Sequence, residues 1–474
     1  MKNCPPASVL IVLTILGCGS SGGGSGASSS NPASSMAPSN PKPIPTPIPL
    51  PNPHPSLTAR FVSLTGSDAS GDGRQNQPWR TITFGVSQLQ MGEELLVEGG
   101  TYRESVDINR GGTPTWLLTI RAVNNGTVIL NPPVGLNSPE GFDIQRGLGF
   151  IRIQGFRIED GFDESIHLRT GSHDILIEDC DVLRNKLGAY IVDAKNATFR
   201  RVKFLDNVSA FAAGVDIVGV SDTILFEDCE SSGHDDGRGS SGDADGFQVG
   251  RDAKNITFRH CTAKNNSEDG FDSKAENTVI ERCTAIGNFI GIKARYTNAR
   301  VENCLVAKNT DLGLSAGGGT LLGPIIIQFC TIVENGAQGL QSDSSWGGGN
   351  FDLDVNHCVF AFNGSRAIDV TTSVRLISDF NIWYRSSNAG PLLTQRGGPQ
   401  TDYTMTQGNL WVQNTGLDQN SFFADPLVLD RVNGQYELSA ISPAQNQGSS
   451  LNSVLIDING QIRANPADLG AYEN

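Results

Sequence analysis

Two short acidic segments contain the residue types that bind a hard metal ion. They are DADGF at residues 243–247 and EDGFD at residues 268–272. The candidate ligands are the carboxylates of Asp245, Glu268, Asp269 and Asp272. Four such groups would repel one another if they lay together without a cation. Calcium suits them because it takes about six to eight oxygen ligands, whereas magnesium keeps more of its water. The alternative is a solvated acidic turn.

A repeat in the sequence predicts that these segments meet. Seven of the nine cysteines end short apolar runs, and five residues after each lies an asparagine or, once, His234. The cysteines are Cys180, Cys229, Cys261, Cys283, Cys304, Cys330 and Cys358. The basic period of 21 to 22 residues, lengthened in some turns by insertions, indicates strands stacked in parallel, coil upon coil. The sequence therefore predicts an all-β, single-stranded parallel β-helix over residues 57–474, with a short capping helix at residues 81–91.

The asparagines and cysteines have structural explanations in such a solenoid. Each asparagine amide would bond its equivalent on the next coil, about 4.8 Å away. The cysteines either form disulfides, which exported proteins often contain, or pack as small buried side chains. Seven is an odd number, and the equivalent inward positions favour reduced, stacked thiols.

Glycines that follow the asparagines set the register of the next strand. Two residues after each glycine comes an outward side chain, which gives the column Tyr190, Asp216, Gln248, Asp272, Lys293, Ser315 and Gln341. Asp272 and Lys293 thus become neighbours, and the four carboxylates gather at one corner.

These segments resemble the calcium-dependent family 9 polysaccharide lyases, which include pectate lyases. The family has an ADGF turn, then NNS before a DDG-aromatic-D turn, then GFK on the next coil; this chain has ADGF at 244–247, NNSEDGFD at 265–272 and GIK at 291–293. The resemblance implies a right-handed, pectin-lyase-like solenoid, calcium bound by the four carboxylates, and Lys293 as the catalytic base. Glu268 and Ile292 depart from the pattern, and QVG at 248–250 lacks a lysine that the family often has there.

The implied chemistry is β-elimination on an acidic polysaccharide. Removing the C5 proton of a uronate requires its carboxylate to be neutralised, by calcium and by Arg295. Solvent-facing roles for Lys293 and Arg295 are the alternatives. Further candidates for the groove wall are His167, Asp216, His234, Asp235, Asp236 and Arg238, with the loop 234–242 beside them. Trp346 is either a sugar platform or a packed loop residue.

The N-terminal sequence predicts export. Residues 1–17 contain an apolar run too short to span a bilayer, and ILGC at 15–18 resembles a bacterial lipobox. We therefore expect lipid anchoring at Cys18, at the outer membrane or cell surface, with an ordinary secretory signal as the alternative. Residues 18–56 are rich in Gly and Ser and then Pro, which predicts a disordered linker.

The net charge of −15 argues against nucleic acid as a partner, and we expect a monomer that binds an acidic polysaccharide. Two other classes of function stay open. One is a glycan-binding or adhesive lipoprotein with structural calcium. The other is a different β-helix carbohydrate enzyme: an alginate or chondroitin lyase, an epimerase, or a glycosidase with paired carboxylates.

Overall fold

A computed structural model describes residues 57–474, except residues 240–241, 318–322, 344–350, 372–373, 388, 397–399 and 450–453. The predicted signal peptide, Cys18, the linker and Trp346 lie outside the described residues. Among the described residues, no helix is both long and apolar enough to cross a membrane.

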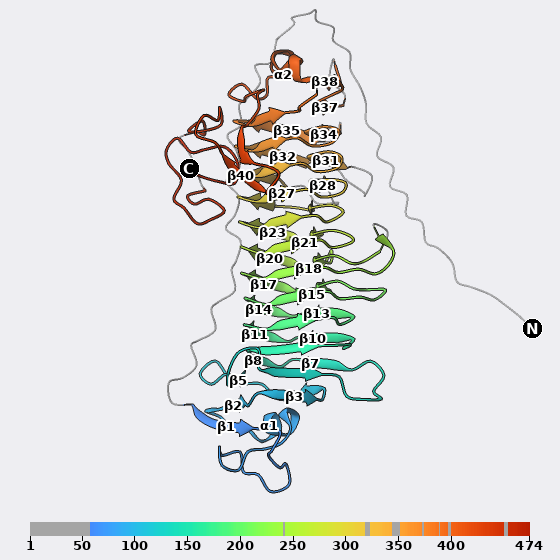
Figure 1. Ribbon diagram of the computed structural model, residues 1–474, viewed down its shortest axis with the longest axis vertical. Helices are drawn as coiled ribbons and strands as arrows, with labels where there is room; N and C mark the ends of the chain where they lie inside the picture. Colours follow the sequence, from blue (N-terminus) through green and yellow to red (C-terminus); the bar gives the residue numbers. More distant parts are fainter. Residues whose placement is uncertain are drawn as a thin grey trace, which may run out of the picture. The chain divides into compact units, whose positions relative to one another are not determined.

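Three long sheets, stacked strand above strand along the solenoid, form the body of the described chain (Figure 1). Sheet 1 consists of β1 (Thr58–Val62), β2 (Glu93–Val97), β5 (Leu118–Ala122), β8 (Gly149–Gln154), β11 (His173–Glu178), β14 (Lys195–Arg200), β17 (Asp222–Glu227), β20 (Lys254–Arg259), β23 (Glu276–Glu281), β26 (Ala299–Glu302), β29 (Ile325–Gln328), β32 (Phe351–Asn356) and β35 (Val374–Asp379). Sheet 2 consists of β4 (Val106–Ile108), β7 (Glu140–Ile144), β10 (Glu164–Leu168), β13 (Leu187–Val192), β16 (Val215–Val218), β19 (Phe247–Val249), β22 (Phe271–Ser273), β25 (Ile292–Arg295), β28 (Leu314–Gly317), β31 (Leu340–Asp343), β34 (Ile368–Val370), β37 (Leu393–Gln395) and β38 (Asp402–Tyr403). Sheet 3 consists of β3 (Gly100–Arg103), β6 (Val128–Asn131), β9 (Phe156–Glu159), β12 (Asp181–Leu183), β15 (Lys203–Leu205), β18 (Glu230–Ser232), β21 (Thr262–Lys264), β24 (Thr284–Ile286), β27 (Leu305–Ala307), β30 (Thr331–Val333), β33 (Val359–Ala361) and β36 (Ile382–Tyr384).

Within these sheets, neighbouring strands pair in parallel, apart from the antiparallel pair β37–β38. Strands alternate inward and outward residues, as in β8, where Ile151 and Ile153 are fully buried between partly exposed neighbours. The predicted parallel β-helix is confirmed, and one continuous apolar core runs through it.

The corner between sheets 1 and 3 is a single residue in the left-handed conformation. It precedes each cysteine, with φ of 56° at Asp179 and 53° at His260. One such residue redirects a strand without a loop, although it is strained for a side chain other than glycine, asparagine or aspartate. The tight corner explains why coils without insertions repeat at a constant length.

The predicted asparagine ladder forms along the next corner. The Asn266 amide nitrogen donates to Asn288 Oδ1 at 2.9 Å, and the same contact recurs between Asn309 and Asn335 at 2.9 Å. His234 occupies one rung, where its Nδ1 accepts the backbone N–H of Asn207 at 3.2 Å. His234 is 1 % exposed, so the prediction that it lines a groove is wrong: the imidazole replaces an asparagine inside the ladder.

All seven repeat cysteines are buried free thiols, which confirms the prediction of reduced stacking over disulfides. Their Sγ atoms contact backbone carbonyl oxygens; Cys283 Sγ lies 3.4 Å from the oxygen of Phe258, for example. Burial raises the pKa of the Cys180 thiol to about 12, so this sulfur stays protonated as part of the apolar core.

Both ends of the solenoid carry additional elements. Helix α1 (Ile82–Gln88), within the stretch expected to be helical, buries Ile82 and Val86 and lies at the blue end in Figure 1. At the other end are a short 3-10 helix η2 (Met405–Gln407) and α2 (Gly408–Thr415). The chain then returns along the side of the coils and forms the two-stranded sheet of β39 (Val428–Asp430) and β40 (Gln435–Leu438), where Tyr436 Oη donates to Glu334 Oε2 at 2.7 Å. This C-terminal segment packs a second apolar cluster against the outer side of sheet 3.

We predict that His234→Asn makes the protein less sensitive to acid. Burial lowers the pKa of His234 to about 3, whereas an unfolded histidine titrates near 6.5. Below pH 6.5 the unfolded chain therefore takes up a proton that the folded chain excludes, and stability present above pH 6.5 is lost as the pH falls toward 3. Between pH 7 and pH 5 the wild type should lose about 2 kcal/mol more unfolding free energy than the variant, measured by urea unfolding.

The control for this comparison is His173→Asn, because the His173 side chain is 39 % exposed. It should keep the wild-type pH dependence. An equal loss in wild type and His234→Asn would contradict the prediction.

Candidate functional site

The site lies on the outer side of sheet 2, where three consecutive coils present polar side chains. Asp272 on β22 is in register with Gln248 on β19 and with Lys293 on β25. The predicted outward column is therefore confirmed as a register. Sequence neighbours of these strands, Asp245 and Asp269, occupy the turns that lead into β19 and β22.

Stacked apolar side chains in the core pack under the outward-facing residues of these coils. The rings of Phe247 and Phe271 lie 5.1 Å apart and are nearly parallel, at 11°. Ile292, in register with Phe271 on the next coil, is fully buried. The isoleucine that departs from the family pattern therefore belongs to the core and does not face the surface.

Glycines in the turns allow the coils to approach closely. A Cβ atom at Gly246 would lie 2.6 Å from the carbonyl oxygen of Gly270, and one at Gly270 would lie 2.5 Å from that of Gly291. No side chain fits at such distances. The glycine column therefore brings the acidic turns together.

Three carboxylates meet at this point. Oxygen atoms of Asp245, Glu268 and Asp269 lie within 4.8 Å of one another. Asp245 and Asp269 are almost completely buried, Glu268 is half-buried, and Asp245 Oδ1 accepts the backbone N–H of Asp269 at 2.9 Å. We call Asp245, Glu268 and Asp269 the acidic cluster. Asp272 was expected to join it; it lies outside this group of three but is close enough to act on Asp245 and Asp269 electrostatically.

Two lysines pair with carboxylates at the site. Lys293 Nζ forms an ion pair with Asp269 Oδ2, and Lys274 Nζ donates to Asp272 Oδ2 at 2.6 Å. The other oxygens, Asp269 Oδ1 and Asp272 Oδ1, are buried without a hydrogen-bond partner among the described residues. Such acceptors normally have a partner.

The pKa values of the cluster reflect crowding and burial. Burial and the charge of Asp269 raise the pKa of Glu268 to about 7. Burial and Asp272 raise the pKa of Asp269 to about 6, although Lys293 opposes the shift, and burial together with Asp269 raises the pKa of Asp245 well above its usual range. For Lys293, burial lowers the pKa, but Asp269 and Asp272 outweigh it, so the net shift is upward.

A divalent cation fits this arrangement. The donors are hard oxygens, the ligand atoms are close together, and two buried carboxylate oxygens have no hydrogen-bond partner. Calcium prefers such a donor set and tolerates its irregular geometry.

Comparison with known proteins identifies the family. The family described as "Pel9A-like, right handed beta helix region" matches residues 60–365. The chain belongs to this family. Pectate lyase PEL9 of Emericella nidulans is 25 % identical over 391 residues, which cover 76 % of this chain and 85 % of that protein. The crystal structure of pectate lyase Pel9A matches with a TM-score of 0.50 at 17 % identity, over 88 % of this chain and 97 % of that one. The uncharacterized protein YwoF of Bacillus subtilis is 30 % identical over 71 residues, which is 15 % of each chain.

The other predicted groove residues of this Pel9A-like chain have different surroundings. Asp216 lines a cavity beside Gln248. His167 is 7 % exposed and its Nδ1 lies 3.4 Å from Glu140 Oε1. Asp235 and Asp236 accept the backbone N–H groups of Gly237 and Arg238, both at 2.8 Å, so they shape the inserted loop.

Sequence reasoning missed Lys274. The Lys274 backbone N–H donates to the carbonyl oxygen of Val249 at 3.1 Å, which places Lys274 one coil from the QVG segment that lacks the family's lysine. Its position two residues after Asp272, on the same side of the strand, was the available signal. Lys274 supplies a positive charge to this corner from the next coil.

We predict that Asp245→Asn removes the response of stability to calcium. Asparagine keeps an oxygen for the Asp269 N–H but removes one buried charge from the cluster. Added calcium should raise the Tm of the wild type and leave that of the variant unchanged, measured by thermal unfolding with calcium or chelator. In chelator the variant should unfold at or above the wild-type temperature, because one uncompensated buried carboxylate is gone.

Asp354→Asn is the matched control, because burial also raises the pKa of Asp354, to about 6, on sheet 1. This control should retain the calcium response. A full calcium-induced shift in Asp245→Asn would contradict a metal site at the cluster.

Proposed function

We propose that this Pel9A-like chain is a calcium-dependent polysaccharide lyase that cleaves an acidic polysaccharide, such as pectate, by β-elimination. The observation that carries the proposal is the placement of the Lys293 amine against the acidic cluster, with its Nζ paired to Asp269. The relationship to pectate lyase PEL9, which extends over most of both chains, supports the same reaction class.

Lys293 is the proposed base. Its side chain is 16 % exposed, so the amine can reach a substrate while most of the side chain is held in place. To act as a base the amine must be neutral, and calcium held by the cluster would favour the neutral form by offsetting the charges of Asp269 and Asp272 that raise the pKa of Lys293. The neutral amine takes the proton from C5 of a uronate, a C4=C5 double bond forms, and the electron pair of the broken C4–O bond leaves with the glycosidic oxygen, which takes a proton from solvent. The chain cleaved in this way has an unsaturated end.

Arg295 is the proposed carboxylate holder. It lies two residues after Lys293 on β25, so both side chains are on the outward side of the strand. A guanidinium can donate two parallel hydrogen bonds to a carboxylate, which orients the uronate above the base.

Calcium fits the acidic cluster, with Asp245, Glu268 and Asp269 as its proposed ligands and Asp272 beside them. Bound there, it would supply positive charge that neutralises the substrate carboxylate and makes the C5 proton more acidic. The buried Phe247 and Phe271 keep these carboxylates in a fixed arrangement.

We predict that Lys293→Ala abolishes product formation while calcium binding persists. Loss of a positioned base costs about 10²- to 10⁴-fold in rate. The measurement is ultraviolet absorbance of the unsaturated product from polygalacturonate, alginate and chondroitin, with calcium or with chelator. The wild type should form product when calcium is present and none when chelator is added.

The matched control is Lys254→Ala, because Lys254 is an exposed lysine on sheet 1 that pairs with Asp222. It should retain wild-type activity. Equal activity in Lys293→Ala and wild type would refute the assignment of the base. Glycan binding without product from the wild type would instead indicate a non-catalytic binding protein.

A further inference from the structure

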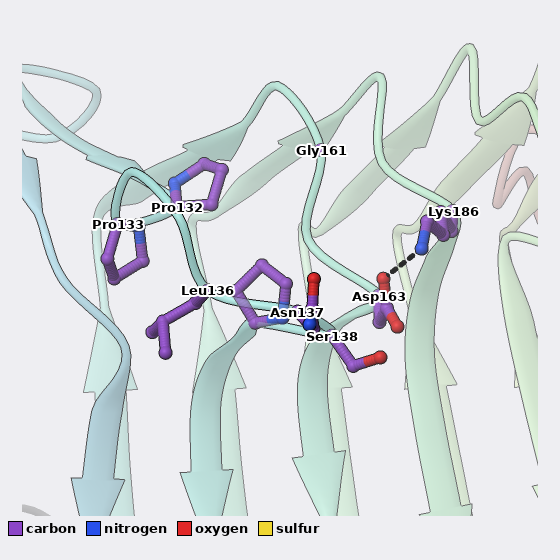
Figure 2. A pocket seen from close by; sticks show the side chains of 9 residues that line it. Pro132, Pro133, Leu136, Asn137, Ser138, Gly161, Asp163 and Lys186 are labelled. Carbon is purple, nitrogen blue, oxygen red and sulfur yellow. Dashed lines mark ion pairs between the residues drawn. The ribbon is translucent and has the colours of Figure 1, made fainter.

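Three adjoining cavities lie along sheet 2 and the turns that lead into it, on the N-terminal side of the acidic cluster. Their volumes are about 370, 700 and 210 Å³. The first and second share Asp163 and Lys186, which form the ion pair drawn in Figure 2. The second and third share Phe211 and Asp216. We call this continuous series of cavities the N-terminal groove.

The N-terminal groove ends two coils from the proposed base. Its third cavity reaches Gln248, which is in register with Asp272 and so is two coils from Lys293. Tyr190, in the second cavity, is four coils from Lys293 in the same column, or about 19 Å at the usual spacing of paired strands. A polysaccharide bound at Lys293 can therefore continue into the groove over several sugar residues.

Most of the charged side chains that line the N-terminal groove are acidic, which disfavours the binding of a polyanion. The residues that line its second and third cavities include Asp163, Glu164, Asp216 and Asp243. Lys186 is the one lysine or arginine among the described residues that line these cavities, and it is paired with Asp163. Carboxylates in a groove without free cations repel a bound carboxylate on each sugar.

The groove also carries surfaces that suit uncharged sugar rings. Phe211 is 65 % exposed and lines two of the cavities, and Tyr190 is half-buried beside it in the second. The Phe211 loop is held by Ser209, whose Oγ accepts the Phe211 N–H at 3.0 Å and donates to the carbonyl oxygen of Lys186 at 3.1 Å. Aromatic faces with a few polar groups around them are typical of small-ligand sites.

The proposed site of cleavage has more cationic side chains than the groove. Lys274, Lys293 and Arg295 lie on β25 and directly after β22, beside the acidic cluster, where Lys274 and Lys293 pair with Asp272 and Asp269. The geometry points to a substrate with one recognised carboxylate at Lys293 and no carboxylates along the N-terminal groove. We propose that the N-terminal groove binds uncharged sugar residues, so that the cleaved uronate is flanked on that side by neutral sugars or esterified uronates. This inference rests on the proposed lyase function.

The first test compares polymers for the full chain with calcium. The substrates are fully de-esterified polygalacturonate, highly methyl-esterified pectin, and a polymer in which uronates alternate with neutral sugars. We expect kcat/KM at least ten-fold higher on one of the last two, and the preferred polymer shows whether esters or neutral sugars occupy the groove. The highest value on polygalacturonate would overturn the inference.

Variants that remove one carboxylate give a second test of the inference. Asp216→Asn should raise kcat/KM on polygalacturonate several-fold at low salt, and by more than on the preferred polymer, because it removes a repulsion that acts on charged sugars. Asp430→Asn, at the end of β39 and outside the lining of the groove, is the control and should change the rate on neither polymer. An unchanged rate of Asp216→Asn on polygalacturonate would count against the inference.

A binding assay separates the groove from the catalytic proposal. Lys293→Ala, with and without Phe211→Ala, is tested for retention by the methyl-esterified pectin and by the alternating polymer in affinity electrophoresis. We expect Phe211→Ala to weaken binding at least five-fold, and Val432→Ala, at an exposed turn residue, to have no effect. If no polymer yields product, the lyase proposal fails, but this assay still tests whether the N-terminal groove binds uncharged sugar residues. Equal retention of Lys293→Ala and of the double variant with Phe211→Ala would overturn the inference about the groove.

Discussion

The fixed spacing between coils is the constraint on which the site depends. Parallel strand pairing sets each coil about 4.8 Å from the next, and the asparagine ladder repeats that spacing inside the corner, as between Asn266 and Asn288. The coils cannot separate without breaking both sets of hydrogen bonds. Residues that are 21 to 24 positions apart, such as Asp245, Asp269 and Lys293, are therefore held side by side.

This rigidity keeps like charges together that would otherwise move apart. Most of the acidic cluster is buried. The pKa values of its three carboxyl groups are raised because burial and mutual repulsion both penalise the charged forms. Lys293 and Lys274 offset part of that penalty through Asp269 and Asp272. Protons and lysines compete for the same oxygens, and a cation at the proposed site would join this competition, which is strong because the scaffold cannot relax. The stacked Phe247 and Phe271 beneath the cluster contribute to that stiffness.

The loops between the strands form surfaces that the repeat does not specify. The loop that carries Ser209 and Phe211 connects β15 to β16, and the loop with Pro132 and Leu136 connects β6 to β7 (Figure 2). Both border the N-terminal groove, so loops on a constant scaffold form much of the surface of this groove. A shared fold therefore does not decide which sugars the proposed groove would accept.

The sequence alone determined the solenoid, its register and the gathering of the acidic turns. A period is a local pattern, and parallel stacking converts equal positions in the period into neighbours in space; this is why Asp272 and Lys293 were paired correctly. The burial of the cysteines followed from the same rule. The tertiary structure alone decided the orientation of side chains and the paths of loops. It showed that Asp272 lies outside the closest group of carboxylates, that the His234 ring is buried and accepts a hydrogen bond from Asn207 instead of lining a groove, and that Lys274 reaches Asp272. These outcomes depend on rotamers, on competition among charges and on contacts between loops, and no repeat encodes them.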